Sequence, residues 1–100
     1  MATEPRLTSN VLKVLGALVS EGELSGSEIA KSTNLASGTL YPLLLRLEDA
    51  GWLDSRWEAG EPSDLGRPRR RYYRVTGKGQ KAISDVVRNL VPAMGKLTWA

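Results

Sequence analysis

The chain has 100 residues, of which 14 are Lys or Arg and 11 are Asp or Glu, and its net charge of +3 is accompanied by no cysteine and no histidine. This length predicts one small domain of a kind that often dimerises. The missing residue types exclude disulfides, thiolate metal sites and histidine-based catalysis, so we expect no metal, no cofactor and no catalytic residue. No apolar run approaches the ~20 residues that span a bilayer, and residues 1–10 lack the apolar core of a signal peptide. We therefore expect a cytoplasmic protein without membrane contact.

The first part of the chain predicts two helices. Apolar residues recur at helical spacing over residues 7–20, and Gly22 is placed to end this helix. Ser25 and Glu28 fit a capping box, which predicts that a short helix covers residues 26–33.

A third helix is expected over residues 37–50, after a tight turn at residues 34–36, with Ser37 as its N-cap. Its core stripe consists of Leu40, Leu43, Leu44 and Leu47. Two helices joined by so short a turn form a helix-turn-helix, in which the second helix reads DNA.

The outer face of this third helix supplies the first candidates for DNA contact: Ser37, Gly38, Thr39, Tyr41, Pro42 and Arg46. Hydroxyl and guanidinium groups bind phosphates or base edges. The alternatives are that Ser37 only caps the helix, that Tyr41 only covers the core, and that Pro42 only shapes the first turn.

A β-hairpin is predicted next, with strands at residues 52–58 and 69–75 and a turn-rich loop between them. We expect four residues to pack in the core or the hairpin: Trp52, Leu53, Trp57 and Tyr73. A helix-turn-helix followed by such a hairpin is a winged helix. The fold class is therefore mainly α with a small β-hairpin: a three-helix core, a wing and a C-terminal helix, with the DNA-binding domain at residues 7–76.

Positive charge is concentrated in the hairpin. Eight consecutive residues hold five arginines and no acid, and the rest of the chain has a net charge of −2; the arginines are Arg67, Arg69, Arg70, Arg71 and Arg74. Such a patch attracts polyanions. Arg67 and Arg69, near the tip, are the best candidates for phosphate or minor-groove contact, and Arg70 and Tyr72 point outward on the strand. A solvated charged face is the alternative.

Arg71 differs from the other arginines because it shares the inward phase of Tyr73 on the strand. Arg71 is therefore as well suited to a structural ion pair as to DNA contact. The acids that could form this ion pair with it are Glu48, Asp49 and Asp54.

The C-terminal part, residues 77–100, predicts a dimerisation helix and tail, with Thr76 as its cap. The apolar stripe comprises Ile83, Val86, Val87, Leu90, Met94 and Leu97. It is longer than the core it can reach, which indicates a homodimer. Pro92 and Gly95 predict that the helix kinks or ends near Val91. At the other end of the chain, residues 1–6 are expected to be a flexible arm.

Two motifs resemble the PadR family of transcriptional regulators. The first is Gly38-Thr39-Leu40-Tyr41-Pro42-Leu43-Leu44-Leu45-Arg46-Leu47-Glu48 followed by Ala50-Gly51-Trp52-Leu53, and the second is Gly66-Arg67-Pro68-Arg69-Arg70-Arg71-Tyr72-Tyr73-Arg74-Val75-Thr76 with Gly79. The resemblance covers residues 11–82, and the length is similar to the short subgroup of the family.

This resemblance implies a homodimer that binds an inverted-repeat DNA operator and usually represses. In some members a small-molecule effector enters a pocket between the subunits. Leu90 stands where short, drug-binding members carry a tryptophan, and Trp99 lies beyond the proline. This departure argues against an effector here.

Two other classes of function fit the sequence less well. A winged helix that contacts only proteins would leave the arginines without a role. An enzyme would have to rely on carboxylates, and Glu48 and Asp49 point apart on a helix, which makes a poor acid–base pair.

Overall fold

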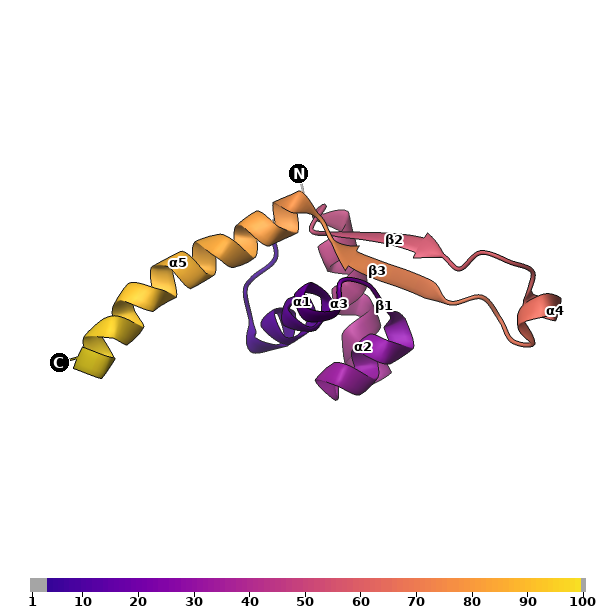
Figure 1. Ribbon diagram of the computed structural model, residues 1–100, viewed down its shortest axis with the longest axis horizontal. Helices are drawn as coiled ribbons and strands as arrows, with labels where there is room; N and C mark the ends of the chain where they lie inside the picture. The colour runs from indigo at the N-terminus through magenta and orange to yellow at the C-terminus, as the bar shows by residue number, and fades with distance from the viewer. Residues whose placement is uncertain (1–3, 100) are drawn as a thin grey trace.

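The computed structural model describes the backbone of residues 4–99 and the side chains of residues 4–89. The elements are α1 (Ser9–Glu21), β1 (Leu24–Ser25), α2 (Gly26–Thr33), α3 (Ser37–Asp49), β2 (Leu53–Trp57), α4 (Pro62–Leu65), β3 (Arg71–Val75) and α5 (Gly77–Trp99). In Figure 1, α1, α2 and α3 are packed together, the β2–β3 hairpin projects to one side, and α5 projects to the other. The mainly helical winged arrangement is therefore confirmed.

The core lies where α1, α2 and α3 meet the root of the hairpin. The predicted stripe of α3 is buried in full, and α1 and α2 contribute Leu15 and Ile29. Leu53 and Tyr73 close the core from the sheet, as expected. Truncating a buried leucine of this kind to alanine destabilises a fold by ~2–5 kcal/mol, so this stripe holds α3 in place with its other face outward.

Local capping residues set the helix boundaries. The side chain of Ser25 accepts from the backbone of Glu28, and the Glu28 carboxylate accepts from the backbone of Ser25, which confirms the capping box. Gly22 ends α1 at φ +87°, a conformation that glycine adopts without strain. The prediction that Ser37 caps α3 is wrong. Ala36 takes the extended cap position without a side-chain bond, so Ser37 is already the first helical residue.

The sheet is antiparallel with the strand order β1-β3-β2. Val75 pairs with Leu53, and Trp57 pairs with Arg71 at the far end of the hairpin. Strand β1 places Leu24 opposite Tyr73, which ties the start of α2 to the wing. Neither β1 nor the short helix α4 within the hairpin loop was expected from the sequence.

Helix α5 is anchored firmly where it starts. The Thr76 hydroxyl accepts from the backbone N–H of Gly79 at 3.1 Å, as the predicted cap requires. A Cβ atom on Gly79 would lie 2.4 Å from the carbonyl oxygen of Trp52, so only glycine allows α5 to approach this residue, which precedes β2, so closely.

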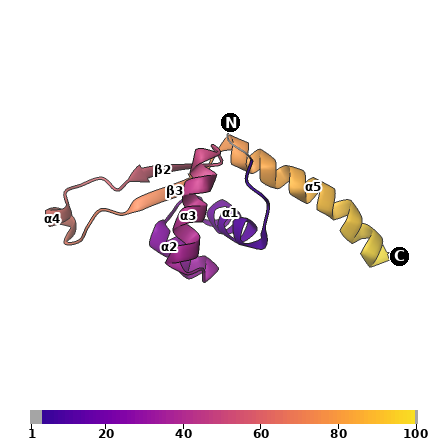
Figure 2. The same cartoon turned by 180° about the vertical axis from the view of Figure 1, so that it is seen from behind.

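The remainder of α5 runs away from the domain in both views (Figures 1 and 2). The helix continues through Pro92 to Trp99, so of the two predicted alternatives an end near Val91 is wrong, and a kink there stays a prediction. A proline removes one backbone hydrogen bond but fixes φ near a helical value, and the bonds on either side hold the helix together.

The N-terminal segment contacts the domain from Glu4 onward. The indole N–H of Trp52 donates to the Glu4 carboxylate at 2.9 Å, and Lys78 pairs with the same carboxylate at 3.2 Å. Pro5 is buried. Residues 4–6, expected within a flexible arm, thus lie against the root of α5. Over residues 4–99, every helix is too short or too polar to cross a bilayer.

Candidate nucleic-acid interface

Helix α3 presents the six predicted contact residues to solvent. We call Ser37, Gly38, Thr39, Tyr41, Pro42 and Arg46 the recognition face, and all of them are exposed. Tyr41 has an exposed fraction of 45%, so its ring does not merely cover the core. Leu45 is more exposed still, at 60%, and was not among the predicted residues.

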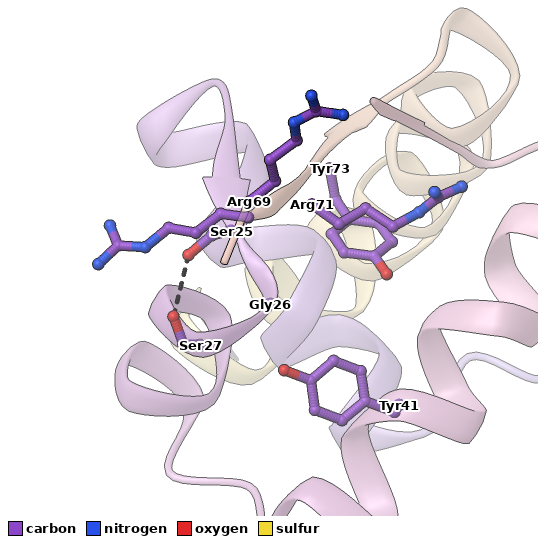
Figure 3. A pocket seen from close by; sticks show the side chains of 8 residues that line it. Ser25, Gly26, Ser27, Tyr41, Arg69, Arg71 and Tyr73 are labelled. Atoms are coloured by element: carbon purple, nitrogen blue, oxygen red, sulfur yellow. Dashed lines mark hydrogen bonds between the residues drawn. The ribbon is translucent and has the colours of Figure 1, made fainter. Parts of the chain in front are cut away.

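A hollow of about 230 Å³ joins the recognition face to the wing (Figure 3). We call it the helix–wing hollow, and it is lined by Ser25, Gly26, Ser27, Tyr41, Arg69, Arg70, Arg71 and Tyr73. It brings Tyr41 of α3 close to the arginines that precede and begin β3. Ser27 was not among the predicted contact residues, and its place between the capping residues Ser25 and Glu28 is the signal in the sequence that could have indicated it.

Gly26 fixes the position of Tyr41 within this hollow. A Cβ on Gly26 would lie 2.8 Å from both the ring and the hydroxyl oxygen of Tyr41. The ring therefore rests directly over the first turn of α2, with its hydroxyl turned toward that turn (Figure 3).

A second hollow, of about 220 Å³, lies between α3 and the start of α1. It is lined by Thr8, Asn10, Thr39, Pro42, Leu43 and Arg46. Thr39 and Arg46 are therefore grouped with Thr8 and Asn10 rather than with the wing.

The wing arginines are not free of acids, which corrects the expectation of an unneutralised patch. Four of them form ion pairs, namely Arg67–Glu58 at 2.6 Å, Arg69–Glu61 at 3.4 Å, Arg71–Glu48 at 3.5 Å and Arg74–Asp54 at 3.6 Å. The acids come from β2, the loop and α3, and of these Asp54 stands directly opposite its arginine, Arg74, in the antiparallel register. Among residues 4–89, Arg70 is the wing arginine that forms no such pair.

Arg71 has the structural role given as an alternative to DNA contact. It pairs with Glu48, which also accepts a hydrogen bond from the Ser55 hydroxyl. Its guanidinium also lies 5.0 Å from the centre of the Trp57 ring. Trp57 itself is 58% exposed, so it packs on the hairpin surface and not in the core.

Tyr72 is half-buried by its neighbours on the wing. The guanidinium of Arg56 lies 5.1 Å from its ring centre, and its hydroxyl lies 3.5 Å from the Glu58 carboxylate. Arg56 is in turn held by Glu23 at 2.6 Å, and this interaction lowers the pKa of the Glu23 carboxyl.

The predicted dimer residues fall into two groups. Ile83 packs partly against the protomer's own core, Val86 is half-buried, and Val87 is 50% exposed. Leu90, Met94 and Leu97 lie outside the described side chains. Within the described residues, no three acidic side chains are grouped in a way that could hold a metal ion.

Solved structures of transcriptional regulators are similar to this fold. A PadR family regulator from Eggerthella lenta is 29% identical with a TM-score of 0.65, and the alignment covers 90% of this chain and 84% of that one. A PadR-like regulator from Bacillus cereus is 24% identical with a TM-score of 0.66, covering 90% and 93%, and supports the fold alone. No curated protein sequence gives a significant match.

One similar structure was solved with DNA. PadR of Bacillus subtilis in complex with operator DNA is 26% identical with a TM-score of 0.63. The match covers 77% of this chain but 47% of that one, so this chain spans about half of its length.

The sequence itself matches the family description "Transcriptional regulator PadR-like family" over residues 14–85. The matched region contains the recognition face, the whole wing and the start of α5. These relatives are regulators and not enzymes. The chain belongs to the PadR-like family of transcriptional regulators.

Proposed function

We propose that the protein is a sequence-specific DNA-binding repressor that binds an inverted-repeat operator as a homodimer. The observation that carries this proposal is the helix–wing hollow, where Tyr41 of the recognition face and Arg70 of the wing line one surface. An exposed helix of this kind enters a major groove, while a neighbouring basic hairpin contacts the adjacent backbone.

The two parts of the surface have different tasks in this proposal. The recognition face supplies base contacts through Thr39, Tyr41 and Arg46, with Ser37, Gly38 and Pro42 at its margin. Arg69, Arg70 and Arg74 supply phosphate contacts, which fix the register and carry most of the affinity. Exposed ion pairs such as Arg74–Asp54 are worth ~0–1 kcal/mol, so a phosphate can displace the acid.

The proposed dimer is built on α5. A helix that extends beyond the domain gains little stability from propensity alone and is stabilised mainly by packing an apolar face. The exposed Val87 begins such a face beyond the protomer's own core. Two copies related by a two-fold axis would present two recognition faces, which matches an inverted repeat. In this proposal residues 7–76 are the DNA-binding domain and residues 77–100 are the dimerisation segment, and the protein acts in the cytoplasm.

Selection of bound duplexes from a random pool tests this function. We expect enrichment of one palindromic sequence whose half-sites lie about one helical turn apart, ~10 base pairs. A single unpaired half-site would contradict the dimer. No enrichment at low salt would contradict DNA binding and favour a winged helix that contacts only proteins.

Repression needs a separate measurement. A reporter placed downstream of the selected operator should be expressed less when the protein is present. Higher expression would identify an activator and overturn this part of the proposal.

A further inference from the structure

The end of the wing hairpin has an unusual closing pair. Beyond the last β-sheet pair, Trp57–Arg71, the backbone N–H of Glu58 donates to the carbonyl of Arg70 at 2.8 Å. The reciprocal bond is made by a side chain, because the backbone N–H of Arg70 donates to the Glu58 carboxylate at 3.3 Å. The carboxylate therefore extends the hairpin by one further pair.

The same carboxylate also holds the far side of the loop. Both terminal nitrogens of Arg67 donate to it, at 2.6 and 2.9 Å, in a two-point contact. Such charge-assisted bidentate pairs fix geometry better than a single contact does. Only 17% of the Glu58 side chain is exposed, against 71% for Glu61 in the same loop. These bonds hold the pKa of the Glu58 carboxyl at about 2, with the Arg67 hydrogen bond as the largest cause.

The wing loop, residues 59–69, is shaped so that Arg67 can reach Glu58. Gly60 and Gly66 adopt positive φ values of +104° and +69°, on either side of α4. The Leu65 side chain packs close to Gly60, and Nε of Arg69 donates to the Gly60 carbonyl at 2.6 Å. The loop is therefore an ordered turn with its own contacts, fastened at Glu58.

We propose that Glu58 is a positioning residue for DNA binding, and that Glu58 and Arg67 form a latch that holds the wing loop so that Arg69 and Arg70 face DNA beside Tyr41. The inference rests on the proposed function. It also reassigns Arg67 from phosphate contact to the latch, because both of its terminal nitrogens already donate to Glu58.

Charge and positioning predict opposite outcomes for the loss of this acid. Removing a carboxylate from a DNA-binding surface reduces repulsion, so charge alone predicts tighter binding. Loss of the latch lets the wing loop move and raises the entropy cost of ordering it on DNA, which predicts weaker binding. Glu61→Gln is the matched control because it removes the same charge from the same loop without touching the latch.

The experiment compares Glu58→Gln, Glu61→Gln and the wild-type chain on the selected operator and on a random duplex of equal length. We expect Glu61→Gln to bind both duplexes slightly more tightly, by about twofold. We expect Glu58→Gln to bind the operator about tenfold more weakly than Glu61→Gln does. Equal tightening by the two substitutions would overturn the proposal.

Hydrogen exchange at the Arg70 amide gives a second measurement that does not involve DNA. We expect faster exchange in Glu58→Gln and in Arg67→Gln, and no further increase in the double variant, because the two side chains act as one latch. Additive increases, or wild-type exchange in Glu58→Gln, would contradict the latch. The thermal unfolding midpoint of each variant serves as the check on folding, and Arg67→Gln replaces Glu58→Gln on DNA if the latter does not fold.

The two proposals fail in different ways. If the wild-type chain binds no duplex, the proposed function fails, and the exchange measurement then decides the latch alone. If the wild-type chain binds its operator and Glu58→Gln binds as Glu61→Gln does, DNA binding stands and the positioning role is wrong.

Discussion

At the scale of single residues, Gly26 and Tyr41 form the most specific contact of the candidate interface. The ring of Tyr41 occupies the space in which any larger residue at position 26 would place its side chain. The position of a group proposed to touch DNA is therefore set by a residue on a different helix. The pairing could not be foreseen from the sequence, because the two residues are far apart in the chain.

Tyr41→Ala should weaken operator binding by ~1–3 kcal/mol, the range for one specific contact. The fold should persist because the ring is 45% exposed. Fluorescence anisotropy with labelled operator measures the affinity, and Tyr41→Phe separates the hydroxyl from the ring. Wild-type affinity in the alanine variant would remove Tyr41 from the DNA-binding surface.

Gly26→Ala should weaken operator binding by displacing the Tyr41 ring. Stability should change little, because the obstructed atoms are at the end of a side chain that can rotate away. The effect should vanish when Gly26→Ala is introduced into the Tyr41→Ala variant, since no ring remains to be displaced. Gly16→Ala is the control, as its Cβ would meet nothing within 4 Å. An undiminished effect in the double variant would show that Gly26 acts by another route.

At the scale of elements, the parts predicted well from the sequence are those with local causes. The capping box of Ser25 and Glu28 and the leucine stripe of α3 need only neighbouring residues, and the structure confirms both. Strand β1 is two residues long and exists because β3 pairs with it, so no local pattern marks it. Glu48 was named in advance as a partner of Arg71, whereas the pairing of Arg74 with Asp54 depends on the register of the hairpin and was not foreseen.

The close approach of α5 to Trp52 gives a prediction on the free energy of unfolding. Gly79→Ala should destabilise the fold by ~1–3 kcal/mol, because its Cβ would lie 2.4 Å from a backbone oxygen that cannot move freely. Gly77→Ala, in the same first turn, meets nothing within 4 Å and should be neutral or stabilising. Urea unfolding of the two variants checks this. Equal midpoints would mean that α5 does not dock as closely as described.

The wing should respond to acid through Glu58. Its pKa is lowered from 4.5 to about 2, so the stabilisation from its contacts is fully present above about pH 4.5 and is lost as the pH falls through about 2. The chemical shift of the Arg70 amide proton, followed by NMR, should therefore change with a midpoint near 2. This change should be absent in Glu58→Gln. A midpoint near 4.5 would show that the Arg67 contact does not persist in solution.

At the scale of the whole molecule, the wing and the helix proposed to form the dimer extend from different sides of the core that carries the recognition face (Figures 1 and 2). The hairpin and α5 project in different directions from the helical core (Figures 1 and 2). A partner bound along the far part of α5 would therefore leave the recognition face uncovered, which a dimeric regulator requires.

Sedimentation equilibrium should show a dimer at micromolar concentration. Val87→Asp should shift it toward monomer, because a charge would be buried in the apolar contact. Asn89→Asp adds the same charge at an exposed position on nearly the opposite side of the helix and is the control. A wild-type monomer under these conditions would contradict the dimer, and a dimer unchanged by Val87→Asp would exclude Val87 from the interface.

The environments of Trp52 and Trp57 give the protein two distinct optical reporters. Trp52 is buried, with its indole bound to Glu4, so its emission should be blue-shifted and should follow unfolding of the core. Trp57 is exposed beneath the guanidinium of Arg71 at the base of the wing loop, so its emission should be red-shifted and accessible to iodide or acrylamide. In a Trp99→Phe variant, the fluorescence spectrum of one unlabelled sample would report two properties. The emission of Trp52 would report whether the core is folded, and that of Trp57 would report whether DNA is bound at the wing.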